Sequence, residues 1–95
     1  MFEGHVEYFV YVLRSCKDSK RYIGLTEDIE KRFKQHQLGY VASTKSRRPF
    51  SIEYFEKYTT RSKARIREKY FKTAAGRRFL DKIQAEMVEL ADTHV

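Results

Sequence analysis

The chain has 95 residues, so it buries about 60 to 65% of its unfolded surface around one core, which predicts a single domain over residues 1–95. A single cysteine excludes an intramolecular disulfide, and no apolar run approaches the roughly 18 residues of a membrane span, so we expect a cytoplasmic protein. The excess of 20 Lys and Arg over 13 Asp and Glu, a net charge of +7, indicates a polyanionic partner.

The first predicted elements are two strands joined by a short turn. Residues 7–14 are rich in β-branched and aromatic side chains, which is typical of a central strand buried on both faces. Residues 20–25 form its partner, and the SCKDS segment between them supplies turn-forming residues. If residues 15–18 form the tip, Tyr11 lies directly opposite Tyr22, and the two phenols share one face of the sheet.

A helix is predicted next, over residues 27–38. Thr26 is a favourable N-cap, two acidic residues then complement the helix dipole, and Gly39 is a natural stop. At 100° per residue, Arg32 lies on the shoulder of the apolar stripe and His36 lies beside it. For His36, a purely structural role near the helix C-terminus remains an alternative to a functional one.

The loop over residues 39–49, GYVASTKSRRP, is rich in Ser, Thr and basic residues. No acidic residue occurs between Lys31 and Ile52, so this part of the chain carries a concentrated positive charge. Such a loop is suited to binding phosphates, although basic runs are also found as ordinary solvated faces. The cations of the loop itself are Lys45, Arg47 and Arg48.

A third strand over residues 50–58 and a second helix over residues 61–75, stopped at Gly76, complete the predicted core. The order β-β-α-β-α predicts an α+β fold in which a three-stranded antiparallel sheet is flanked by helices. We expect this core to span residues 8–80, followed by a tail with weak helical character over residues 81–95.

Glu68 is the one acidic residue of the second helix, at the border between its inward and basic faces. Surrounding cations favour the ionised carboxylate, which is then available to hold a divalent cation. The alternative is an ordinary helix salt bridge with Arg65, Arg67 or Lys72.

These residues resemble the GIY-YIG nuclease superfamily, specifically its small single-domain branch. FVY at residues 9–11 stands at the first motif, with Tyr11 matching its tyrosine, and YIG at residues 22–24 matches the second motif in full. Arg32 and His36 match the arginine and histidine of the helix that follows. The TKSRRPF segment resembles the basic loop of the branch, and Glu68 matches the metal-binding glutamate.

The resemblance implies an endonuclease that hydrolyses phosphodiester bonds, in DNA rather than RNA, in repair or recombination. Its catalytic residues would be Tyr11, Tyr22, Arg32, His36 and Glu68. Glu68 would hold one Mg²⁺ or Mn²⁺, Arg32 would stabilise the scissile phosphate, and one tyrosine would activate water. We expect Arg32, His36 and Lys45, with the metal, to supply the positive field that a phenolate needs.

The expected nucleic-acid contacts extend from the second motif to the basic loop and the second helix. Because a domain of this size has no room for a separate DNA-reading module, substrate specificity would come from nucleic-acid shape, from a partner protein or from oligomerisation. The residues expected to contact nucleic acid are Gly24, Lys45, Arg47, Arg48, Arg65, Lys69 and Lys72.

Two other functions remain as alternatives. The first is a nucleic-acid-binding module that retains the basic surface without cleavage. The second is an enzyme with Cys16 as a nucleophile and a histidine base, although a lone cysteine at a hairpin tip has no evident orienting group.

Overall fold

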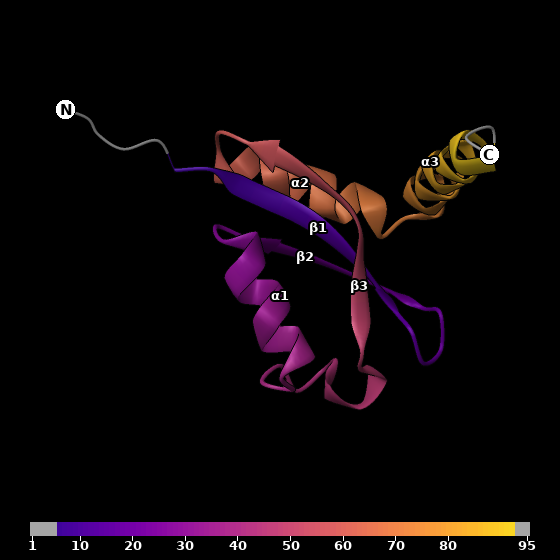
Figure 1. Cartoon of the computed structure of the whole chain (residues 1–95). Helices are drawn as coiled ribbons and strands as arrows, with labels where there is room; N and C mark the ends of the chain where they lie inside the picture. Colours follow the sequence, from indigo (N-terminus) through magenta and orange to yellow (C-terminus); the bar gives the residue numbers. More distant parts are fainter. Residues whose placement is uncertain (1–5, 93–95) are drawn as a thin grey trace.

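The computed structural model describes residues 6–92, and the side chains of residues 6–87. Figure 1 shows a three-stranded sheet with helices packed against it. The predicted α+β class and antiparallel sheet are confirmed. In chain order, the elements are β1 (Tyr8–Ser15), β2 (Arg21–Thr26), α1 (Ile29–Gln37), the 3₁₀ turn η1 (Lys45–Arg47), β3 (Phe50–Tyr58), α2 (Arg61–Phe71) and α3 (Ala74–Asp92).

The central strand is β1, which pairs antiparallel with both neighbours to give the sheet order β2-β1-β3. α1 and α2 lie on opposite faces of this sheet (Figure 1), so β1 is buried on both faces, as its unbroken apolar composition predicts. Alternate side chains of β1 therefore enter two cores. The α2 side contains Val10, Val12, Ala64, Phe71 and Leu80, and the α1 side contains Tyr11, Leu13, Phe50, Ile29 and Phe33.

The register of the hairpin differs from the prediction. Tyr11 pairs with Gly24 rather than with Tyr22, because the turn spans residues 16–20 instead of 15–18. Tyr22 is consequently two residues away along the partner strand, which keeps it on the same face as a diagonal neighbour. The two tyrosine rings have centroids 6.3 Å apart, so the phenols still lie together.

The predicted start of the first helix was also wrong. Asp28, rather than Thr26, is the N-cap of α1, because its carboxylate accepts a hydrogen bond from the Lys31 amide at 3.0 Å. Thr26 lies two residues earlier, where its hydroxyl accepts from the Asp28 amide at 3.2 Å. The helix ends before Gly39, whose φ of +83° fits the predicted glycine stop.

The second helix is shorter than predicted, since α2 ends at Phe71 and a new helix, α3, starts at Ala74. Thr73 divides the two helices. Its hydroxyl donates to the Tyr70 carbonyl at 2.6 Å and accepts from the Gly76 amide at 3.1 Å, which caps α3. Gly76 therefore lies inside α3 and is not the stop that the sequence suggested.

A glycine is required at position 76 because the start of α3 packs against the end of α2. A Cβ atom at Gly76 would lie 2.0 Å from the Tyr70 carbonyl oxygen and 2.6 Å from the Phe71 Cα atom. Both are backbone atoms, so the clash cannot be relieved by rotating a side chain.

We expect Gly76→Ala to lower the free energy of unfolding by about 1 to 3 kcal/mol or more, because the two helices must separate to admit the methyl group. Urea unfolding followed by circular dichroism measures this loss. Ala75→Ser, which adds one atom at the exposed neighbouring position, is the control and should be nearly neutral. Equal stability of the Gly76→Ala and unchanged proteins would contradict this packing.

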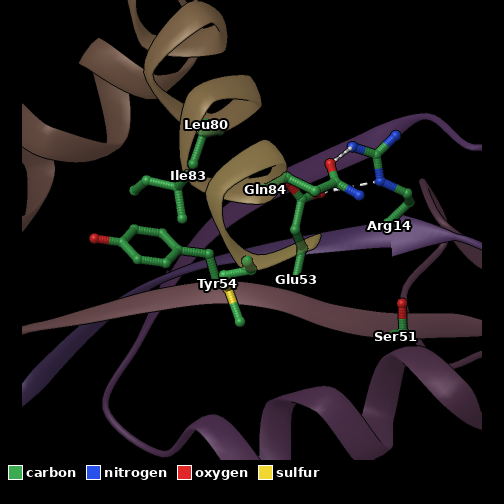
Figure 2. A pocket seen from close by; sticks show the side chains of 8 residues that line it. Arg14, Ser51, Glu53, Tyr54, Leu80, Ile83 and Gln84 are labelled. Atoms are coloured by element: carbon green, nitrogen blue, oxygen red, sulfur yellow. Dashed lines mark hydrogen bonds and ion pairs between the residues drawn. The ribbon is translucent and has the colours of Figure 1, made fainter. Parts of the chain in front are cut away.

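α3 is fastened to the sheet by two arginines. Arg14 contacts Glu53 of β3 at 3.1 Å and Gln84 of α3 at 2.8 Å, and Arg21 contacts Glu53 at 2.9 Å and Asp81 at 2.8 Å. Figure 2 shows Arg14, Glu53 and Gln84 converging beside a cavity of about 300 Å³ between α3 and β3. This network fixes the direction in which α3 leaves the sheet.

α3 continues unbroken across residues 80 and 81, where the sequence suggested a division between core and tail. That division stays a prediction, and residues 93–95 of the expected tail lie outside the described residues. Within residues 6–92, no helix is both long and apolar enough to cross a membrane.

Candidate active site

The innermost part of the candidate site is the Tyr11 side chain, which is only 2% exposed. Its hydroxyl lies 3.0 Å from Nε2 of His36. The ring fits because Gly24, on the neighbouring strand, has no side chain: a Cβ atom there would lie 2.4 Å from the Tyr11 hydroxyl oxygen. Gly24 is itself buried, and the absence of a side chain at this position leaves the space that the Tyr11 ring occupies.

His36 is fully buried, and hydrogen bonds fix its tautomer. Its Nδ1 atom lies 2.8 Å from the Thr44 hydroxyl, which donates to the Val41 carbonyl at 3.4 Å. Because that carbonyl can only accept, Nδ1–H donates to Thr44 and Nε2 accepts from the Tyr11 hydroxyl. Burial, and secondly the positive charge of Arg32, lower the pKa of His36 from 6.5 to about 4.

The expected positive field around the phenols is therefore smaller than predicted. His36 is neutral at physiological pH, so it contributes no charge. Burial raises the pKa of Tyr11, and Arg32 is the main group that opposes this shift. Arg32 itself stays a cation, since its contact with Tyr11 raises the pKa of the guanidinium, and Gln35 accepts from its Nη1 atom at 3.0 Å.

We expect the His36 imidazole to remain neutral down to about pH 4, which an NMR titration of its ring protons measures directly. An unfolded chain protonates this histidine near pH 6.5, so it binds more protons than the folded protein between pH 6.5 and 4. The lowered pKa contributes on the order of 3 kcal/mol to the free energy of unfolding, and this contribution is complete above pH 6.5 and is lost as the pH falls toward 4. His36→Gln identifies the signal, and a midpoint at or above 6.5 would contradict the buried, neutral assignment.

Tyr22 and Glu68 line the same cavity beside β2, the edge strand of the sheet. Tyr22 is half-buried, with its ring centroid 4.9 Å from that of His36. Both Tyr22 and Glu68 line a cavity of about 600 Å³ that lies between the hairpin and the ends of α2 and α3. The negative charge of Glu68 also contributes to the raised pKa of Tyr11, after burial and the tyrosine and arginine neighbours. The structure therefore brings Tyr11, Tyr22, Arg32, His36 and Glu68 together.

Glu68 shows features of both roles that the sequence left open, a helix salt bridge and a metal ligand. Its carboxylate lies 3.6 Å from Arg65 and 3.2 Å from Lys72, the salt bridges expected for a helix surface, whereas Arg67 pairs with Glu56 instead. However, Glu68 is 8% exposed, and its Oε1 atom is buried without a hydrogen-bond partner in the described part of the chain. Nη1 of Arg65 faces this oxygen at 3.6 Å, which is too long for a hydrogen bond, so the oxygen can still contact a metal cation.

The residues around Glu68 fit one Mg²⁺-like cation that takes a single carboxylate from the protein and its remaining ligands from water and phosphate oxygens. Within residues 6–92, no group of three or more His, Cys, Asp and Glu side chains converges on one point. Mg²⁺ commonly keeps several waters and takes one or two carboxylates plus phosphate oxygens. A single protein carboxylate is therefore sufficient for Mg²⁺, although not for a site built wholly from protein ligands.

The basic loop is more strongly tied to the protein than the sequence suggested. Arg47 contacts Asp18 at 3.3 Å and lies over the Phe50 ring at 5.7 Å. Arg48 donates to the Lys45 carbonyl at 2.8 Å. By contrast, the side chains of Lys45 and Lys69 are exposed on η1 and α2, and neither lines the cavity that Tyr22 and Glu68 line.

Cys16 is exposed in the hairpin turn. His36 is the one histidine in residues 6–92, and both of its ring nitrogens are engaged by Tyr11 and Thr44. It is thus not placed to act as a base for Cys16, and the described residues lend the cysteine-nucleophile alternative no support.

Residues 7–81 match the family model of the GIY-YIG catalytic domain. The chain belongs to the GIY-YIG family. It is similar to a UPF0213 protein of Listeria welshimeri, 43% identical over 67 residues that cover 70% of this chain and 73% of the relative. It is also similar to a UPF0213 protein of Staphylococcus epidermidis, 39% identical over 79 residues that cover 82% and 95% of the two chains.

The chain is also similar to a solved structure. The solution NMR structure of the UPF0213 protein from Bacillus halodurans matches this chain with a TM-score of 0.51 and 27% sequence identity. The match covers 82% of this chain and 85% of that chain. The family match to a catalytic domain points to nuclease activity on a nucleic-acid substrate.

Sequence reasoning missed two residues that support the GIY-YIG site. Thr44 fixes the tautomer of His36, and Gln37 holds the loop to β3 by accepting from the Phe50 amide at 2.7 Å. Thr44 was one of several polar residues of the loop, and Gln37 was notable only as a departure from the asparagine that related proteins usually have at the end of this helix. The signal for Thr44 was its place in the Ser- and Thr-rich loop, but nothing in the sequence indicated that this loop folds back onto α1.

Proposed function

We propose that this protein is a metal-dependent endonuclease that hydrolyses phosphodiester bonds in DNA. The observation that carries the proposal is the cavity lined by both Tyr22 and Glu68, whose buried Oε1 atom makes no hydrogen bond and has only the Arg65 guanidinium, at 3.6 Å, as an ion-pair partner in the described part of the chain. Membership of the GIY-YIG family and the net charge of +7 support the same reading.

Glu68 is the residue that would hold the metal, as a single Mg²⁺ or Mn²⁺. The bound cation would neutralise charge that develops on the phosphate and lower the pKa of a coordinated water. Arg65 and Lys72 already lie against the same carboxylate, so their positive charges would lie close to the phosphates of a bound substrate.

We assign Tyr22 as the tyrosine that meets the attacking water. Tyr22 lines the cavity together with Glu68, whereas Tyr11 is almost fully buried and its hydroxyl donates a hydrogen bond to His36. Through the contacts of their rings, Tyr11 and His36 hold Tyr22 in place. The Tyr22 hydroxyl oxygen then accepts a hydrogen bond from the water and orients it toward the phosphorus.

Arg32 is assigned to the scissile phosphate. Its guanidinium stays charged beside Tyr11 and Tyr22, and its fork of N–H groups matches two oxygens of a phosphate. A donor of this kind strengthens its contacts as negative charge builds on those oxygens, so it stabilises the transition state more than the ground state.

The proposal is tested by incubating the purified protein with single-stranded, duplex, nicked, flap and branched DNA, and with RNA, with Mg²⁺ or with EDTA. We expect cleavage of at least one DNA substrate, only when Mg²⁺ is present. Cleavage of RNA alone would overturn the assignment to DNA.

The alternative function is a nucleic-acid-binding module without cleavage, favoured by the basic loop and by the salt bridges that Glu68 makes. Salt-dependent binding to every substrate of the same panel, without cleavage of any of them in Mg²⁺ or Mn²⁺, would establish this alternative and exclude the nuclease.

A further inference from the structure

The cavity that holds Tyr22 and Glu68 continues past them, along the hairpin turn and onto the first turn of α3. Its walls carry five basic residues and a single acid, Glu68, in a space of about 600 Å³. A concave surface lined by one sign of charge concentrates oppositely charged ligands. The basic residues are Arg14, Lys20, Arg21, Lys72 and Arg77.

Ion pairs divide these cations into two groups. Arg14 and Arg21 are neutralised by Glu53 and Asp81, and Lys72 pairs with Glu68. The side chains of Lys20 and Arg77 are exposed and make no hydrogen bond or ion pair within the described part of the chain. Lys20 and Arg77 are therefore the uncompensated positive charges of the cavity.

The backbone beneath Lys20 is held in place by the hairpin turn. The Lys20 carbonyl accepts from the Ser15 amide at 2.9 Å, and the Lys20 amide donates to Asp18 at 2.9 Å. Asp18 is in turn paired with Arg47 at 3.3 Å. The turn thus fixes the backbone of Lys20, an exposed residue that lines the cavity.

The backbone beneath Arg77 is equally constrained. The neighbouring residue, Gly76, is buried where α3 packs against α2, and the Arg77 amide donates to the Thr73 carbonyl at 3.0 Å. Arg21 fastens the next turn of α3 to the sheet through Asp81. Arg14 does the same through Gln84 (Figure 2). These contacts direct Arg77 into the same cavity as Tyr22 and Glu68.

We propose that Lys20 and Arg77 form a phosphate-binding site for the nucleic-acid backbone that flanks the scissile bond. α3 is then part of the substrate-binding surface, and the strand runs from Glu68 across the hairpin turn to the start of α3. This inference rests on the proposed function, because it extends the same cavity. The two residues contact flanking phosphates and not the reacting atoms, so they contribute to binding rather than to the chemical step.

The test compares Arg77→Ala with Arg78→Ala in the full chain, since the next residue of α3 carries the same charge but does not line the cavity. Binding of a DNA substrate is measured in EDTA over a series of salt concentrations. We expect Arg77→Ala to weaken binding about three- to tenfold and to reduce the slope of log affinity against log salt by about 0.7 to 0.9, while Arg78→Ala changes neither.

Lys20→Ala should behave like Arg77→Ala. Its control is Lys17→Ala in the same turn, because the Lys17 ammonium donates to the Ser46 carbonyl and lies outside the cavity. In Mg²⁺, both cavity variants should raise KM and leave kcat unchanged. Circular dichroism confirms that each variant is folded.

The outcomes separate this inference from the proposed function. If the unchanged protein binds and cleaves DNA but Arg77→Ala and Arg78→Ala have equal salt slopes, the flanking site is wrong and the nuclease stands. If the slope falls only in the Lys20 and Arg77 variants but no substrate is cleaved, the flanking site stands and the nuclease is wrong. A protein that binds no nucleic acid overturns both.

Discussion

The Glu68→Gln variant will bind DNA at least as tightly as the unchanged protein and will lose Mg²⁺-dependent cleavage by about a thousandfold or more. Glutamine keeps the size of the side chain and its capacity for hydrogen bonds, but it lacks the charge that a hard cation requires. Binding is preserved because the substitution removes a negative charge from a surface that meets phosphates. Glu68→Ala should fail in the same way.

A purely structural role for Glu68 predicts a different result. Its partners Arg65 and Lys72 are 63% and 55% exposed, so loss of these pairs would cost about 1 kcal/mol or less, with cleavage retained. Glu86→Gln, which neutralises an exposed carboxylate of α3, controls for the change in net charge. Cleavage by Glu68→Gln at the unchanged rate would remove Glu68 from the mechanism.

Replacement of Tyr22 by phenylalanine should lower kcat by about 10² to 10⁴, because it removes the hydroxyl that orients the water. The aromatic ring remains, with its centroid 4.9 Å from that of His36 and 6.3 Å from that of Tyr11, so the free energy of unfolding should change little. Single-turnover cleavage at saturating DNA measures the chemical step separately from binding.

The matched control is Tyr40→Phe, which removes a hydroxyl from a tyrosine that is 75% exposed and should cleave normally. Cleavage by Tyr22→Phe at the rate of this control would show that the Tyr22 hydroxyl does not take part. Loss of activity in Tyr11→Phe alone would transfer the role to the Tyr11 and His36 pair.

The sheet and the approximate positions of the first two helices could be predicted because local patterns determine them. The apolar run of β1 fixes its central place, and the strand from Phe50 to Tyr58 has the bounds that its composition predicts. The end of α2 could not be read in this way. It depends on the Thr73 hydroxyl and on the packing around Gly76, and both form only when α3 docks against the end of α2.

The candidate site shows the same division. The resemblance to the GIY-YIG motifs named Tyr11, Tyr22, Arg32, His36 and Glu68, but it could not indicate which tyrosine lines the cavity or that His36 is neutral. Burial and hydrogen bonds decide these properties, and they arise from a loop that returns to α1 through Thr44. The shared location of Lys20 and Arg77 likewise could not be predicted from the sequence, because they lie 57 positions apart and line one cavity only once α3 has docked.

The most direct test of the account is the location of a bound divalent cation. Mn²⁺ added in small amounts to the ¹⁵N-labelled protein broadens the NMR signals of nearby amides, even at a weakly occupied site. We predict that the strongest broadening falls on amides of α2 around Glu68 and of β2 around Tyr22, and that it disappears in Glu68→Gln. Broadening centred elsewhere, or unchanged in Glu68→Gln, would contradict a metal-dependent site at Glu68.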